Sequence, residues 1–175
     1  MMMHLRFLLP IMFACSLSLT TAHADTPFVK YKYNLPPSAE LSYLIQSKQS
    51  GISLGGNAVV RWAAREKKFS VQTEAHAMLF GKILDSKSEG IIDDYGLAPV
   101  SWTEKRLRRD RTTTTFDRST GTIRFSASEL TYPINGGEQD RNSAIWQLVS
   151  IARAASAKFK PGSEWTFFVA GQRDA

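Results

Sequence analysis

The sequence predicts an α+β fold that is mainly β: a curved antiparallel meander, like a half-barrel, packed on one long helix. Two observations lead to this prediction. Apolar and polar residues alternate through much of the region 39–126, which is typical of antiparallel strands with one solvated face. After Gly137 the apolar residues recur at helical spacing, and an amphipathic helix must cover its apolar side. We expect about seven or eight strands and a helix near 140–158.

Residues 1–24 have the layout of a secretory signal peptide. Arg6 supplies a positive charge, residues 7–19 are mostly apolar, and an Ala-x-Ala site ends at Ala24, just before Asp25. The apolar stretch is short and contains Pro10, so we expect cleavage between Ala24 and Asp25 and no transmembrane segment in the mature chain. The predicted location is therefore periplasmic or secreted.

The amino-acid composition limits the kinds of binding partner that we expect. The chain has 22 Lys and Arg against 16 Asp and Glu, a modest excess that serves solubility first. Exported proteins rarely meet nucleic acid, so we expect none, and an acidic partner would be a lipid or another envelope component. The single cysteine, Cys15, lies in the predicted signal peptide. Lipid attachment there is the alternative to cleavage after Ala24, but bulky Phe13 fits that signal poorly.

The first three strands follow a proline-containing lead-in. We expect residues 25–38 to form this extended segment and residues 39–175 to form a single domain. Strands are predicted around 41–46 and 57–64, with a glycine-rich turn between them. The third strand, 69–77, is the clearest, because its alternation is strict. The side chains expected to share its inward face are those of Phe69, Val71, Thr73, Ala75 and Ala77.

Turn residues divide the remainder of the chain. A fourth strand is predicted near 83–92, a turn at 93–96, a hairpin of strands 99–108 and 111–116, and a short strand at 122–126. Another strand is expected from Trp165 to Val169. The apolar stripe of the helix, which we expect to face the sheet, consists of Ile145, Leu148, Val149, Ala152 and Ala155.

Five short segments, in their order and spacing, resemble the DUF3108 family of exported bacterial proteins of unknown function. They lie at residues 37–43, 96–99, 116–118, 140–143 and 161–167. The resemblance covers about 39–175 and implies a curved sheet wrapped partly round a helix, similar to the periplasmic lipoprotein-carrier half-barrels. Family members continue with further strands, so it also implies an incomplete domain, truncated naturally or by gene prediction. The family brings no agreed catalytic residues.

No catalytic or metal-binding set emerges from the residue spacing, and we expect no cofactor. His76 lies on the polar side of the third strand, where solvent exposure is the expectation. Asp93 and Asp94 suggest the paired carboxylates of glycoside cleavage, but neighbouring strand residues point to opposite sides, and Tyr95 and Gly96 continue as a turn. An envelope glycan hydrolase is therefore only the third functional hypothesis.

The leading hypothesis is a non-enzymatic binding or envelope-maintenance protein that holds an apolar or lipidic ligand. Its candidate site is a concavity between sheet and helix, although residues of this kind usually form a core. The residues that would line it are Tyr43, Ile45, Trp62, Phe69 and Val71.

The second hypothesis is an interaction module that docks on anionic envelope polymers or on a protein. It rests on the basic hairpin near Trp102, for which a charged edge that resists aggregation is the simpler explanation. The basic residues are Lys105, Arg106, Arg108, Arg109 and Arg111. On a strand, Arg106 and Arg108 would share the face of Trp102, and the other three would lie on the opposite face.

Overall fold

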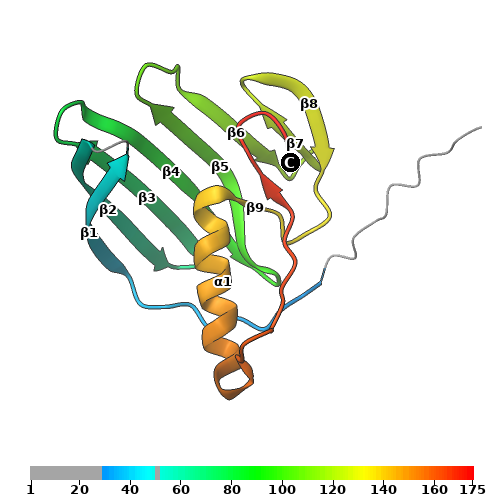
Figure 1. Cartoon of the computed structure of the whole chain (residues 1–175). Helices are drawn as coiled ribbons and strands as arrows, with labels where there is room; N and C mark the ends of the chain where they lie inside the picture. Colours follow the sequence, from blue (N-terminus) through cyan, green and yellow to red (C-terminus); the bar gives the residue numbers. More distant parts are fainter. Residues whose placement is uncertain (1–28, 50–51) are drawn as a thin grey trace, which may run out of the picture.

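The computed structural model describes residues 29–49 and 52–175 (Figure 1). The predicted fold class is confirmed: the described residues form an open sheet of eight antiparallel strands, which does not close into a barrel, with one helix packed on it. The predicted cleavage site at Ala24 and Asp25 lies outside the described residues.

The eight strands lie in the sheet in chain order, so each pairs with the next. They are β1 (Ala39–Gln49), β2 (Ile52–Arg65), β3 (Lys68–Ala77), β4 (Gly81–Asp93), β5 (Gly96–Arg106), β6 (Thr112–Asp117), β7 (Thr122–Phe125) and β8 (Ser128–Pro133). The helix α1 (Arg141–Ala155) is followed by a 3₁₀ turn, η1 (Ser156–Lys158).

The strand predicted from Trp165 to Val169 is wrong over most of its length. Only Val169–Ala170 is a strand, β10, and it pairs in parallel with another two-residue strand, β9 (Gln139–Asp140). The main reason is tertiary: aromatic side chains of residues 165–168 pack against other parts of the chain, and β-propensity alone does not supply a pairing partner.

The two faces of the sheet differ as the alternation predicts. We call the side that contacts α1 the inner face and the other side the outer face. In β3, Phe69, Val71 and Ala75 are buried on the inner face. The outer face carries ion pairs, including those of Arg61 with Glu40 and with Glu74. At β3 the sheet is therefore buried on its inner side and solvated on its outer side.

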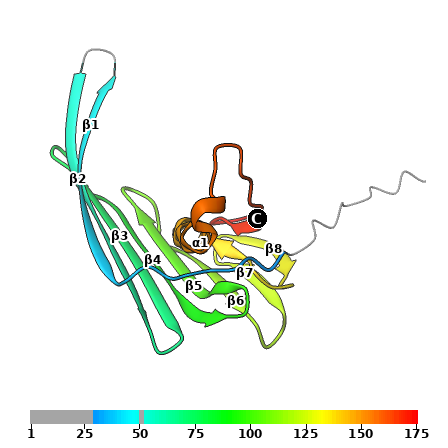
Figure 2. The ribbon, with the colours of Figure 1, turned by 90° about the horizontal axis from the view of Figure 1, so that it is seen from below.

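Three register irregularities interrupt the described sheet, which bends around α1 (Figure 2). They lie between Ala75 and His76 in β3, between Glu89 and Gly90 in β4, and between Arg124 and Phe125 in β7. A side chain at Gly90 would place its Cβ 2.2 Å from the carbonyl oxygen of Ala98. Glycine at this position thus allows β4 and β5 to approach closely at the bulge.

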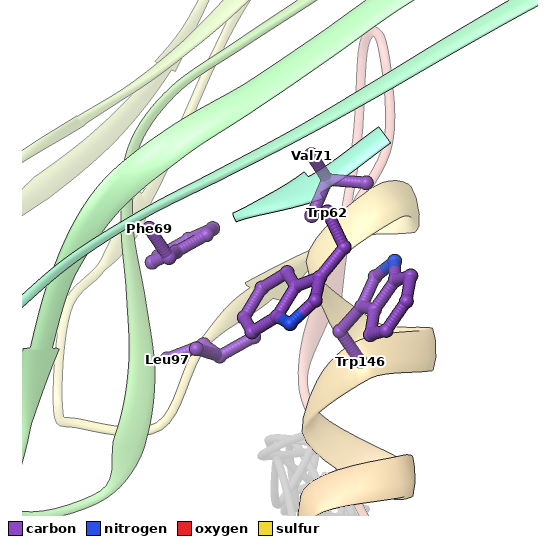
Figure 3. Close-up of a cluster of buried hydrophobic side chains, with 5 residues drawn as sticks. All are labelled: Trp62, Phe69, Val71, Leu97 and Trp146. Atoms are coloured by element: carbon purple, nitrogen blue, oxygen red, sulfur yellow. The ribbon is translucent and has the colours of Figure 1, made fainter. Parts of the chain in front are cut away.

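The helix is joined to the sheet by a pair of stacked tryptophans (Figure 3). The rings of Trp62, in β2, and Trp146, in α1, are 4.7 Å apart and nearly parallel. Phe69, Val71 and Leu97 complete this cluster. Each large aromatic ring buried here contributes both area and preferred ring geometry, so the stack defines how α1 sits on the sheet.

A second cluster lies at the other side of the sheet. Phe116, Ile123 and Phe125, from β6 and β7, pack with Ala170 of β10. Phe168 contacts the same cluster, with its ring 5.8 Å from that of Tyr132. The C-terminal segment therefore covers the inner face at β6 and β7.

The predicted orientation of the helix is wrong. Ile145 is 64% exposed and Leu148 41% exposed, and Val149 is exposed as well. The buried side of α1 lies next to this stripe and consists of Ser143, Trp146, Gln147, Ser150 and Ile151.

Specific polar contacts explain this rotation of α1. The side-chain amide of Gln147 accepts a hydrogen bond from the Leu97 N–H at 2.8 Å and donates one to the Tyr95 carbonyl at 2.6 Å. These bonds satisfy two backbone groups at the start of β5, which would otherwise be buried without partners. Polar residues thus occupy the buried side, and the apolar stripe turns outward.

The helix begins at Arg141 because Asp140 caps it. One carboxylate oxygen of Asp140 accepts from the N–H groups of Asn142 and Ser143, and the Ser143 hydroxyl accepts from the Asp140 N–H, which is a capping box. The other carboxylate oxygen accepts from the Ser88 hydroxyl of β4. Burial raises the pKa of Asp140 above its ordinary value, although these hydrogen bonds oppose the effect.

The helix orientation can be tested with two neighbouring substitutions. Trp146→Ala should lower the free energy of unfolding by about 3–5 kcal/mol, because it removes half of the tryptophan stack. Ile145→Ala should change it by less than about 0.5 kcal/mol, because its side chain is exposed. Urea unfolding followed by circular dichroism gives both values. Equal losses for the two variants would contradict the orientation described above.

The pH dependence of stability tests the cap. Above pH 3.8, the ordinary pKa, the unfolded chain releases the Asp140 proton before the folded chain does, so this group lowers stability as pH rises towards its folded-state pKa. Asp140→Asn keeps a good cap but does not ionise. The variant should therefore gain stability relative to the wild type as the pH rises above 3.8, measured by urea unfolding. A difference that stays constant with pH would contradict the argument.

Candidate apolar ligand site

The residues predicted to line a ligand site separate into two groups. Trp62, Phe69 and Val71 belong to the core beneath α1. Tyr43 and Ile45 lie on the inner face of β1, but they are 49% and 43% exposed. The register explains the separation, because the β1 residue opposite Trp62 is Ala39, which places Tyr43 two inward-facing positions further along the strand.

The inner face beyond α1 is apolar and contains small side chains. Tyr43 lies opposite Ala58, Ala58 opposite Ala75, and Ala75 opposite Leu84. Paired residues share a face of the sheet. Tyr43 and its neighbours on β1 thus remain accessible beside a row of alanines, although this surface alone does not enclose a ligand.

A cavity of about 780 Å³ lies on the other side of α1. The exposed stripe of the helix contributes Leu148, and the loop after the helix contributes Phe159, Trp165 and Phe167. The cavity volume is within the range of small-molecule sites, which are mainly apolar. Leu148, which was predicted to face the sheet, and Trp165 and Phe167, which were predicted to lie in a strand, therefore line this cavity instead.

The loop of residues 159–167 has a defined shape. The Ser163 N–H donates to the Lys160 carbonyl at 3.0 Å, and Gly162 has a φ of +84°. With Pro161 before the glycine, this is the chemistry of a type II turn. The rings of Phe159 and Trp165 stack across the turn, with centroids 5.4 Å apart. The Pro-Gly pair between two aromatic residues is the sequence signal that would have predicted this loop.

The lead-in holds the loop against the rest of the protein. The ring of Tyr31 contacts that of Phe167 edge-on at 5.8 Å, and its hydroxyl accepts from the Thr166 N–H at 3.1 Å. The same lead-in contacts α1, where the Asn34 N–H donates to the Ser150 carbonyl at 2.8 Å. These contacts fix one wall of the cavity relative to the helix.

The cavity keeps large apolar groups accessible. Phe159 is 53% exposed, and both Leu148 and the neighbouring Val149 are exposed. Lys160 and Glu164 provide charges among the lining residues. Exposed apolar surface bordered by polar groups is typical of sites that take up an apolar partner, and the lining of the cavity combines both kinds of group.

The basic hairpin is split between the two faces of the sheet, as its alternation predicts for the strand residues. Arg106 lies on the inner face, where its guanidinium pairs with the buried Glu104 at 2.5 Å. Lys105 lies opposite Asp85 of β4, and Asp85 pairs with Arg111 at 3.1 Å on the outer face.

The remaining two basic residues lie in the turn between β5 and β6. Arg108 and Arg109 follow the end of β5, which is Arg106 rather than the predicted residue 108. Arg108 has a φ of +57°, and the Arg109 N–H donates to the Arg106 carbonyl at 3.1 Å. Arg108 and Arg109 therefore do not lie in a strand, and the prediction that Arg108 shares a strand face with Trp102 is wrong.

The acidic pair forms a turn. A carboxylate oxygen of Asp93 accepts from the Tyr95 N–H at 2.8 Å, and Asp94 pairs with Lys30 at 3.3 Å. The Tyr33 hydroxyl donates to the Asp93 carbonyl at 3.0 Å. These contacts give the pair a structural role at the β4–β5 turn. A hollow of about 430 Å³ adjoins it.

The groups with shifted pKa values do not gather in one place. Hydrogen bonds from the hydroxyls of Ser119 and Thr120 lower the pKa of Asp117 to about 2. A hydrogen bond from Lys82 is the main cause of the lowered pKa of Glu74. Asp117 lies at a turn and Glu74 on the outer face, and neither lines the cavity, so these shifts do not indicate catalysis there.

The described residues contain neither a cluster suited to a metal ion nor a helix suited to a membrane. No group of three His, Cys, Asp or Glu side chains is placed to hold a metal ion in this part of the chain. No helix among residues 29–49 and 52–175 is long and apolar enough to cross a membrane. His76 lies on the outer face opposite Asn57, the polar side on which it was predicted.

The sequence matches no protein-family model, no curated protein and no solved structure. The expected likeness to the DUF3108 family therefore depends on the five sequence segments alone.

Proposed function

We propose that this protein is an exported, non-enzymatic binding protein that holds an apolar or lipidic ligand in the cavity beside α1. The observation that supports this most directly is the cavity of about 780 Å³ with Leu148, Phe159 and Trp165 in its lining. A signal-peptide pattern in residues 1–24 supports export to the periplasm or outside the cell.

The ligand class follows from the chemistry of the lining. Apolar side chains cover most of the cavity, and removing their surface from water favours binding by about 25 cal/mol per Å². Lys160 is the basic residue among the described residues that line the cavity. We therefore propose a ligand with a single acyl chain and an anionic or zwitterionic end, such as a fatty acid or a lysophospholipid.

One tryptophan can report this binding specifically. The chain has four tryptophans, of which Trp62, Trp102 and Trp146 are buried and Trp165 lines the cavity. Adding lysophosphatidylcholine below its micelle concentration should shift the emission to shorter wavelength and protect it from acrylamide, because the ligand removes Trp165 from water. The same titration on Trp165→Phe should show neither change. A ligand response that survives in Trp165→Phe would place binding elsewhere.

A matched pair of leucine substitutions tests the position of the ligand. Leu148→Gln should weaken binding about tenfold, because an apolar contact worth about 1.5 kcal/mol is lost. Leu130→Gln is the control, since Leu130 is also exposed, at 54%, but lies on β8. The affinities come from the Trp165 titration. If the two variants bind equally well, the cavity is not the site.

A second function, docking on an anionic surface, is favoured by a separate observation. Within the described residues, Arg108 and Arg109 have no carboxylate within ion-pair distance, whereas Arg106 and Arg111 each have one. Cations without internal partners are available to external anions. The turn that contains Arg108 and Arg109 also exposes the apolar side chain of Leu107.

A further inference from the structure

Two turns of the meander lie side by side at one end of the sheet. Every second turn of a meander falls at the same end, so the β3–β4 turn, 78–80, and the β5–β6 turn, 107–111, both lie at the upper edge in Figure 1. The Leu107 N–H donates to the Ile83 carbonyl at 2.9 Å, so the two turns are neighbours. We call them together the hairpin end.

The β3–β4 turn exposes three consecutive large apolar side chains. Met78, Leu79 and Phe80 are 83%, 75% and 53% exposed. The turn itself requires only Gly81, which has a φ of +66° and open space around it. Turns of this type usually contain small polar residues. The backbone of the turn therefore does not require large apolar side chains at these three positions, and a contiguous exposed set of this kind indicates a binding surface.

The adjacent β5–β6 turn supplies positive charge. Five of the seven residues from 105 to 111 are Lys or Arg, and one is Asp. Among the described residues, Arg108 and Arg109 have no carboxylate partner, and Leu107 between the basic residues is 41% exposed. The hairpin end thus combines an apolar tip with uncompensated cations.

We infer that the hairpin end docks on the surface of an anionic lipid bilayer. The apolar triplet enters the boundary between headgroups and acyl chains, and Arg108 and Arg109 contact the negative headgroups. Apolar side chains next to a basic cluster are the pattern of proteins that lie on membranes. A tip of three apolar residues is also far smaller than a standard protein interface, which takes about 20–30 residues from each partner.

This inference is independent of the cavity beside α1. The cavity residues come from α1 and from the loop 159–167, whereas the hairpin end comes from the turns of the sheet. Docking would nevertheless bring the protein to a source of lipid ligands. Leu148→Gln should leave vesicle binding unchanged, so a failure of one proposal is distinguishable from a failure of the other.

Flotation with vesicles tests the docking. The chain from Asp25, which contains every described element, is mixed with vesicles of phosphatidylcholine alone or of phosphatidylcholine with phosphatidylglycerol. It should float only with the anionic vesicles, and raising the salt concentration should release it. Arg108→Gln and Arg109→Gln should each reduce the partition coefficient about fivefold. Leu79→Ser with Phe80→Ser should reduce it about tenfold or more.

Matched controls come from the opposite end of the sheet. Ile91→Ser removes an apolar side chain that is 40% exposed, and Lys67→Gln removes a charge at the β2–β3 turn; neither should change flotation. Circular dichroism confirms that each variant is folded. Absence of flotation, equal flotation with both vesicle types, or an unchanged partition after the Leu79 and Phe80 substitutions would each overturn bilayer docking. In the last case the arginines bind polyanions without insertion.

Discussion

The stack of Trp62 on Trp146 is the contact on which the rest of this structure depends. It joins α1 to β2, the second strand of the sheet, with ring centroids 4.7 Å apart, and together with the hydrogen bonds of Gln147 it fixes the rotation of the helix. Once Trp146 points inward, Leu148 must lie at the outer side, because residues two apart on a helix do not share a face. The apolar cavity is therefore a consequence of the stack, together with the loop that closes over Leu148.

The inner face is unusual because many of its buried residues are polar. Ser88 contacts the cap residue Asp140, and Thr114 donates to the Gly171 carbonyl at 2.7 Å. Glu104 accepts from Gln172 at 2.5 Å. Buried polar groups are stabilising only when they are hydrogen-bonded, so these strands require α1 and the C-terminal segment in one specific position. These hydrogen bonds thus specify where α1 and the C-terminal segment lie on the sheet, while the aromatic clusters supply buried apolar surface.

The two ends of the open sheet have different surroundings. At one end, the lead-in contacts the β4–β5 turn through Tyr33 and Asp93, which ties the N-terminal part of the described chain to the fold. At the other end, the turns after β3 and β5 hydrogen-bond to other strands through the N–H groups of Met78 and Leu107. Their side chains Leu79 and Phe80 and the arginines are exposed. An open meander allows this division, because alternate turns fall at opposite ends.

The sequence by itself determined the class of the fold and the faces of its clearest strands. Side-chain direction in a strand alternates locally, so the inward positions of Phe69 and Val71 can be read without knowing the partners. The rotation of α1 was decided only by tertiary contacts: Gln147 binds backbone groups of the β4–β5 region about 50 residues earlier, which no local hydrophobic pattern reveals. The cavity likewise brings together the helix and a loop whose aromatic residues resemble a strand in sequence, so its position depends on packing between distant segments.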